Sequence, residues 1–176
     1  MKYDNEVVSL QQDTYHAFFL HDRSKYFHLQ SGKVYAAKTL DNLGFDENMD
    51  RASDDLNPLS GPYCLKGVKA GDVLVINILD VNITRDVGLS SQGILPEFIG
   101  GQYGKPVLGE DIVFWAIEDG CCHPVVGGKT EEFLAVKQEL MVGCIRCSDS
   151  AEERECLSST TADRFGGNLD CKLIKK

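Results

Sequence analysis

The 176-residue chain has too little positive charge for a nucleic-acid-binding surface. It contains 18 Lys and Arg residues against 27 Asp and Glu residues, which gives a formal net charge of −9 at pH 7. Nucleic-acid binding needs a basic surface that displaces phosphate counterions, and anionic lipid also attracts basic segments. The composition therefore argues against nucleic acid and against a membrane as partners.

The sequence also lacks a long apolar run and a secretion signal. No apolar stretch reaches the roughly 20 residues that span a bilayer. The first residues, MKYDNE, do not show the basic-then-apolar pattern of a signal peptide. The seven cysteines are an odd number, which favours reduced thiols over a disulfide framework. We therefore expect a cytoplasmic protein.

What the sequence does contain is a repeated alternation of turn residues and short β-branched segments. Asn57-Pro58 and Gly61-Pro62 predict turns, and residues 73–81 predict a buried strand. Further strands are expected at residues 34–40 and 111–117, in pairs within 7–29 and 131–147, and residues 118–129 are expected to form a loop. The pattern predicts a mainly β fold, a β-sandwich of short, largely antiparallel strands, and the length predicts a single domain over residues 1–176.

Three segments resemble the acetamidase/formamidase family, in the order in which that family carries them. Residues 57–81 read NPLSGPYCLKGVKAGDVLVINILDV, which is similar to the family's Gly-Pro, short strand, Gly-Asp turn and alternating strand. Residues 165–170, FGGNLD, look like its His-Gly-Gly-Asn-x-Asp signature, and residues 39–41, TLD, resemble an early strand that ends in Asp. The resemblance covers roughly residues 15–172.

The resemblance implies a hydrolase of C–N bonds in small linear amides such as formamide and acetamide. It also implies assistance by a divalent metal, zinc or calcium. Carried over position by position, Gly166, Gly167 and Asn168 would bind the substrate, and Asp41 and Asp170 would bind the metal. No catalytic residue is assigned.

Physical arguments support this set of residues but leave alternatives open. On an extended backbone Asn168 and Asp170 would lie on one face, and Gly166-Gly167 would let backbone approach a ligand. The alternative is a glycine turn followed by a strand with two exposed polar residues. For Asp41 the alternative is an Asx-turn, in which the carboxylate accepts hydrogen bonds from its own backbone.

Two departures from the family pattern favour a chain that does not act alone. Phe165 stands where the family has histidine, and phenylalanine has neither a lone pair nor a proton to transfer. The family's later Gly-Asp-x-His and Gly-Asp-Gly-Glu segments, whose glutamate is thought to be the general base, have no counterpart here. We therefore expect the front portion of the family's fold, with a homo-oligomer or a partner chain completing it. The alternative is a catalytically inactive β-sandwich that serves as a binding or assembly subunit.

Other candidate ligand groups are weaker. Cys144 and Cys147 form a C-x-x-C that could join Cys156 and Cys171, but a zinc ribbon needs a second close-spaced pair, so ordinary thiols are favoured. Cys121 and His123 would share one face of an extended chain, but two ligands do not complete a structural zinc site. Of the histidines near the N-terminus, His16 is the best candidate. The acidic residues 45–57 are expected to form a solvated loop.

Overall fold

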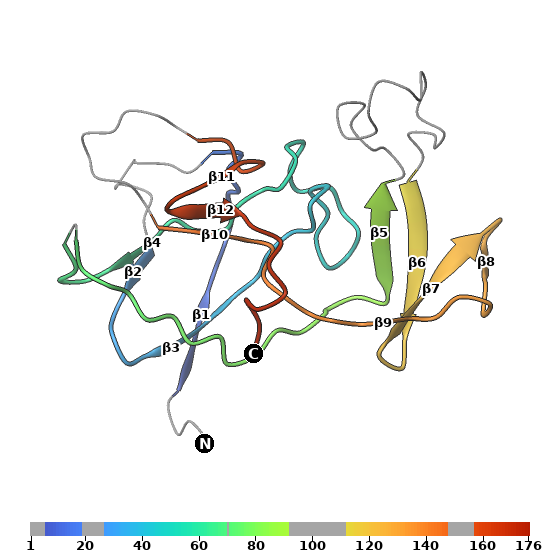
Figure 1. Cartoon of the computed structure of the whole chain (residues 1–176), viewed down its shortest axis with the longest axis horizontal. Helices are drawn as coiled ribbons and strands as arrows, with labels where there is room; N and C mark the ends of the chain where they lie inside the picture. Colours follow the sequence, from blue (N-terminus) through green and yellow to red (C-terminus); the bar gives the residue numbers. More distant parts are fainter. Residues whose placement is uncertain (1–5, 19–26, 70, 92–111, 148–156) are drawn as a thin grey trace. The chain divides into compact units, whose positions relative to one another are not determined.

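The computed structural model describes residues 6–18, 27–69, 71–91, 112–147 and 157–176 (Figure 1). The described residues form twelve short strands and no helix. The expected mainly β fold is confirmed, and most strand pairings are antiparallel. A sandwich arrangement of these strands stays a prediction. The described segments contain no helix with the length and apolar character that crossing a bilayer requires.

The chain divides into two compact units. The first unit comprises residues 1–81 and 141–176, and the second comprises residues 82–140. The described strands of the first unit form three small sheets. Two are parallel pairs, β1 (Val7–Leu10) with β3 (Val34–Ala37) and β2 (Phe27–Leu29) with β4 (Tyr63–Leu65). The third is antiparallel, with β12 (Gly166–Asn168) between β10 (Cys144–Arg146) and β11 (Ala162–Asp163).

The described strands of the second unit form one antiparallel sheet. Its strands are β5 (Val87–Ser91), β6 (Ile112–Glu118), β7 (Cys121–Val126), β8 (Lys129–Thr130) and β9 (Val136–Lys137). The strand expected at residues 111–117 is confirmed as β6. The loop expected at residues 118–129 is wrong, because half of these residues form β7. Asp119 and Gly120 have φ of 48° and 75°, as in the tight hairpin turns that Asp-Gly favours, so β7 folds directly back onto β6.

The strand expected at residues 73–81 does not form. No backbone hydrogen bond joins residues 73–79 to another described residue, although their composition is typical of a strand. Val73 is 88% exposed and Val75 is 81% exposed. A strand requires a neighbour for its hydrogen bonds, and no described strand pairs with this segment. β-Propensity alone was therefore insufficient at this position.

The most deeply buried side chain described in the first unit is polar. The Ser159 side chain is 1% exposed. Proline aside, Leu40 is the most buried aliphatic or aromatic side chain among the described residues, and it is 9% exposed. The Ser159 N–H donates to Ala17 O (2.8 Å), and its hydroxyl donates to Leu56 O (3.0 Å). Its own carbonyl accepts a hydrogen bond from the Cys144 thiol (3.4 Å). Ser159 thus joins the segment before β2, the acidic loop and β10 through satisfied hydrogen bonds.

Candidate functional site

The first candidate site lies at the end of β12, the central strand of the three-stranded sheet (Figure 1). Asn168 is the last residue of β12 and is the register partner of Cys144 on β10. Directly opposed residues in an antiparallel pair project to the same face, so the Asn168 amide and the Cys144 thiol share one side of the sheet. The Asn168 amide nitrogen is 3.5 Å from Thr160 O, at the limit of a hydrogen bond.

Gly166 and Gly167 make close backbone contacts, but with neighbouring protein backbone. Their φ values are 105° and 128°. A Cβ added at Gly166 would lie 2.3 Å from Ile145 O, and one added at Gly167 would lie 2.3 Å from Thr161 O. The space that glycine leaves free is therefore filled by the flanking backbone of β10 and of the segment before β11. Binding of substrate by these two residues stays a prediction.

Asp170 also lies near Cys144, but its backbone is not extended as the sequence predicted. It lies beyond β12 with φ of 44°, so the extended spacing from Asn168 does not apply. Its N–H donates to Gly143 O (3.0 Å), which turns the chain back against β10. Burial raises the pKa of the Cys144 thiol, and the nearby Asp170 carboxylate raises it further. The structure therefore places the Asn168 amide opposite Cys144 and the exposed Asp170 carboxylate beside it.

Asp41 adopts the Asx-turn. Its Oδ1 accepts hydrogen bonds from Leu43 N (2.9 Å) and Phe45 N (2.9 Å), so one carboxylate oxygen already serves the local backbone. Within the described ranges, no group of three or more His, Cys, Asp or Glu side chains is placed to hold a metal ion. Zinc usually takes four ligands and calcium six to eight. The residues described here do not complete such a shell, and we derive no chemical step through a metal.

Residues 41–45 and 46–50 form two successive loops with the same hydrogen-bond pattern. In residues 46–50, Asp46 Oδ1 accepts hydrogen bonds from Asn48 N (2.8 Å) and Asp50 N (2.9 Å), as Asp41 does in residues 41–45. Each loop closes through a backbone bond from its first N–H to its fifth carbonyl, both 3.0 Å long. The fourth residue is left-handed in both, with φ of 89° at Gly44 and 64° at Met49. Within the expected solvated loop of residues 45–57, residues 46–50 therefore have a defined conformation held by the Asp46 side chain.

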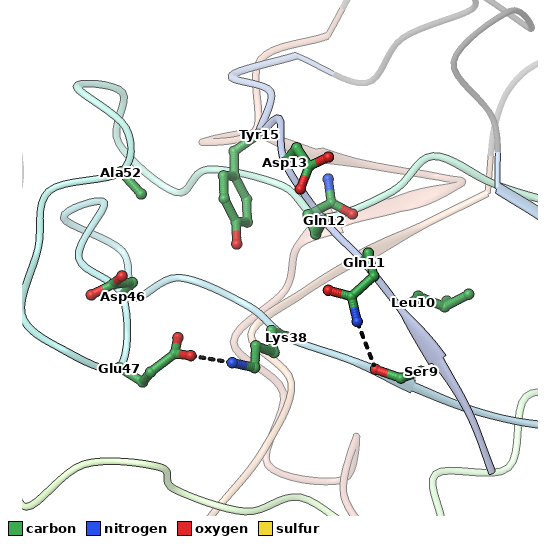
Figure 2. A pocket seen from close by; sticks show the side chains of 10 residues that line it. All are labelled: Ser9, Leu10, Gln11, Gln12, Asp13, Tyr15, Lys38, Asp46, Glu47 and Ala52. Carbon is green, nitrogen blue, oxygen red and sulfur yellow. Dashed lines mark hydrogen bonds and ion pairs between the residues drawn. The ribbon is translucent and has the colours of Figure 1, made fainter.

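The second loop lines an open pocket with Asp46 and Glu47, and sequence reasoning missed this pocket (Figure 2). The cavity has a volume of about 320 Å³, and residues 9–13 also line it. Lys38 and Glu47 form an ion pair at its edge. The Tyr15 side chain points toward this pair, and its pKa is raised by burial and then by the Glu47 and Asp46 carboxylates. The pocket is thus polar and acidic, with a tyrosine that keeps its proton.

The signal for this pocket in the sequence was weak. Asp41 and Asp46 are five residues apart, which is the length of the repeated loop. Of the two fourth positions, only Gly44 is a residue type that indicates a left-handed backbone. Met49 occupies the equivalent position in the second loop, and methionine gives no such indication. Lys38 and Tyr15 come from separate segments, so only the folded chain brings them beside Glu47.

The remaining sequence candidates are placed apart from any ligand cluster. His16 exchanges backbone hydrogen bonds with Leu59, which gives it a structural position. Cys121 and His123 are two residues apart in β7, so they lie on one face of the strand, as expected for an extended segment. The six described cysteines are all free, including Cys144, Cys147 and Cys171. Cys156 lies outside the described residues.

Comparison with known proteins adds no relative. No family model matches the chain, and no curated protein is significantly similar to it. The resemblance to the acetamidase/formamidase family therefore rests on the three sequence motifs.

Proposed function

We propose that this chain takes part in the hydrolysis of C–N bonds in small linear amides, with Asn168 and Asp170 contacting the amide. The observation that carries the proposal is the shared position of these two side chains next to Cys144 at the end of β12. The motif that suggested them is intact except for Phe165.

The two side chains suit different atoms of an amide substrate. The Asn168 NH₂ group can donate to the carbonyl oxygen, where negative charge develops in the transition state. The Asp170 carboxylate can accept a hydrogen bond from the amide N–H₂. Neither group accounts for activation of water or protonation of the departing nitrogen. The proposal therefore includes a second polypeptide, either another copy or a partner chain, that supplies the general base.

Two further features belong to the same proposal. A divalent metal such as zinc or calcium would need ligands beyond Asp170, because the described residues do not complete a shell. We also propose a cytoplasmic location, on the basis of the six free thiols among the described residues.

The test is ammonia release from formamide and acetamide by the full chain, purified together with any other protein that stays bound to it. Asn168→Ala should lower the rate by roughly a hundredfold, as loss of a donor to the reacting carbonyl does in other hydrolases. Asp170→Ala should also lower the rate, because the amide N–H₂ group loses the acceptor that orients it. Asp119→Ala is the matched control, because Asp119 is also exposed and also has positive φ. Absence of ammonia release, or equal rates for the Asp170 and Asp119 variants, would contradict the proposal.

A second candidate function is a non-catalytic binding or assembly subunit. It is favoured by the exposed, unpaired apolar segment at residues 73–79, which has the composition of an inner strand. In this alternative the segment is covered by another chain, and the residues around Cys144 have no substrate.

A further inference from the structure

Gly143 precedes β10 and holds the chain that follows β12. Its carbonyl oxygen accepts hydrogen bonds from two consecutive N–H groups, Leu169 N (3.1 Å) and Asp170 N (3.0 Å). These two bonds turn the chain as it leaves the strand. They also fix the backbone from which the Asp170 side chain projects.

The absence of a side chain at Gly143 leaves room for the Asp170 carboxylate in its present position. A Cβ added at Gly143 would lie 2.9 Å from Asp170 Oδ1, closer than real Cβ atoms approach other heavy atoms, and it would meet nothing else among the described residues within 4 Å. The φ of Gly143 is not in the left-handed region, so alanine suits its backbone. A Cβ at this position would therefore displace one carboxylate oxygen, which ends a flexible, exposed side chain and can rotate away.

We infer that Gly143 is a positioning residue that holds the Asp170 carboxylate in place beside Cys144 and opposite Asn168. Its carbonyl orients the Asp170 backbone, and its lack of a Cβ leaves the place that the carboxylate occupies. The consequence for amide hydrolysis rests on the function proposed above. The steric dependence between the two residues does not rest on it.

The test is urea unfolding of Gly143→Ala in three backgrounds: wild type, Asp170→Asn and Asp170→Ala. In the first two, the side chain of residue 170 must turn aside for the new Cβ, and the equilibrium constant for unfolding should rise roughly fivefold, which is the cost of a less favoured rotamer. In Asp170→Ala the oxygen is gone, so Gly143→Ala should change this constant less than about twofold. An equal change in all three backgrounds would overturn the inference.

Gly88→Ala serves as the matched control. An added Cβ at Gly88 would meet Trp115 and Ile117 side-chain atoms at 3.6 Å, an ordinary contact, and the φ of Gly88 is also outside the left-handed region. Its effect on unfolding should be independent of residue 170. An effect of Gly88→Ala that varied with residue 170 as the Gly143 effect does would overturn the inference.

The second readout is hydrolysis of formamide by the same variants. Gly143→Ala should lower kcat/KM in the wild-type background by roughly tenfold, because the displaced carboxylate no longer meets the substrate. It should add nothing in the Asp170→Ala background, and a further loss there would overturn the inference. If the wild type releases no ammonia, the function proposed above fails, while the unfolding measurements still decide the role of Gly143.

Discussion

Left-handed residues fix much of the local structure of the first unit. Gly44 has φ of 89° and is buried, and a Cβ at this position would lie 2.1 Å from Ser53 O. Gly32 has a similar φ of 80°, but nothing lies within 4 Å of the position of its absent Cβ. Both glycines therefore have a left-handed φ, but only Gly44 also lacks room for a side chain.

Alanine at Gly44 should destabilise the protein more than alanine at Gly32. Both substitutions force a left-handed φ on a residue with a Cβ, at about 1–2 kcal/mol. At Gly44 the overlap with Ser53 O adds further cost, for a total of about 3 kcal/mol in the free energy of unfolding. Urea unfolding measures both values. Equal losses at the two positions would show that the contact with Ser53 relaxes freely.

Because of Tyr63, the free energy of unfolding should depend on pH in the alkaline range. Its ring is 5.8 Å from that of Phe27, and burial raises its pKa above the ordinary value of 10.0. The folded state therefore retains the phenolic proton to higher pH than the unfolded state does. The resulting stability is fully present below pH 10 and is lost as the pH rises from there through the folded pKa.

Replacing Tyr63 by Phe should weaken this loss of stability. Because the pKa of Tyr15 is also raised, Tyr15→Phe should have an effect of the same sign, and the double variant should show the flattest profile. The measurement is urea unfolding at a series of pH values from neutral to above 10. A wild-type profile that is level across pH 10, or one that rises, would contradict the assignment.

At the scale of elements, the two five-residue loops show how aspartate side chains replace strand hydrogen bonds. Asp41 and Asp46 each satisfy two N–H groups that no sheet reaches. The second loop also places Glu47 beside Lys38 in the pocket. The geometry of the pocket therefore depends on the loop.

Asp46→Ala should destabilise the protein by about 1–2 kcal/mol, because two N–H groups lose their acceptor. Asp46→Asn keeps the oxygen at Oδ1 and should cost less. Asp54→Ala is the control, since this carboxylate is exposed and pairs only with Arg51 among the interactions described; a change within about 0.5 kcal/mol is expected there. The free energy of unfolding is measured for all three variants. A loss at Asp46 no larger than that at Asp54 would contradict the capping role.

The elements also show what local patterns in the sequence could and could not predict. The strand around Trp115 and the one that begins at Val34 were predicted, because each carries several β-formers in a row and each finds a partner. The strand β7 was missed because Pro124 and two cysteines weaken its pattern, although Asp119-Gly120 is a hairpin signal. The segment at 73–81 was predicted as a strand on composition and has no described partner.

At the scale of the whole molecule, the exposed segment at residues 73–79 is the strongest indication of association. Burying an exposed valine or isoleucine side chain in a contact provides roughly 1.5–3 kcal/mol. Val73 and Val75 are almost fully exposed, and Ile76 is 60% exposed. Contact with another polypeptide would also pair the backbone groups of the segment.

Val75→Lys should therefore reduce association, as measured by sedimentation velocity at micromolar concentration. Leu173→Lys is the control, because Leu173 is 85% exposed, close to the 81% of Val75, but lies outside the segment. We expect the wild type and the Leu173 variant to sediment as an oligomer or with a retained partner chain. A wild type that sediments as a stable monomer with nothing bound would contradict this expectation.

The sequence by itself determined the class of the fold and the identities of the candidate residues. Frequent turn residues and short β-branched segments are local properties, so the mainly β architecture followed from them. Asn168 and Asp170 were found by their resemblance to a family motif. Their expected arrangement on an extended backbone was wrong, because Asp170 has φ of 44°.

The tertiary structure decided which groups lie next to one another. The place of Asp170 depends on hydrogen bonds to Gly143, a residue 27 positions earlier in the chain, and on the space left by that glycine. Asp41 satisfies backbone N–H groups because the chain closes a loop around it. Such contacts arise from steric fit and from hydrogen bonds between distant segments, and neither residue type nor spacing along the chain encodes these locally.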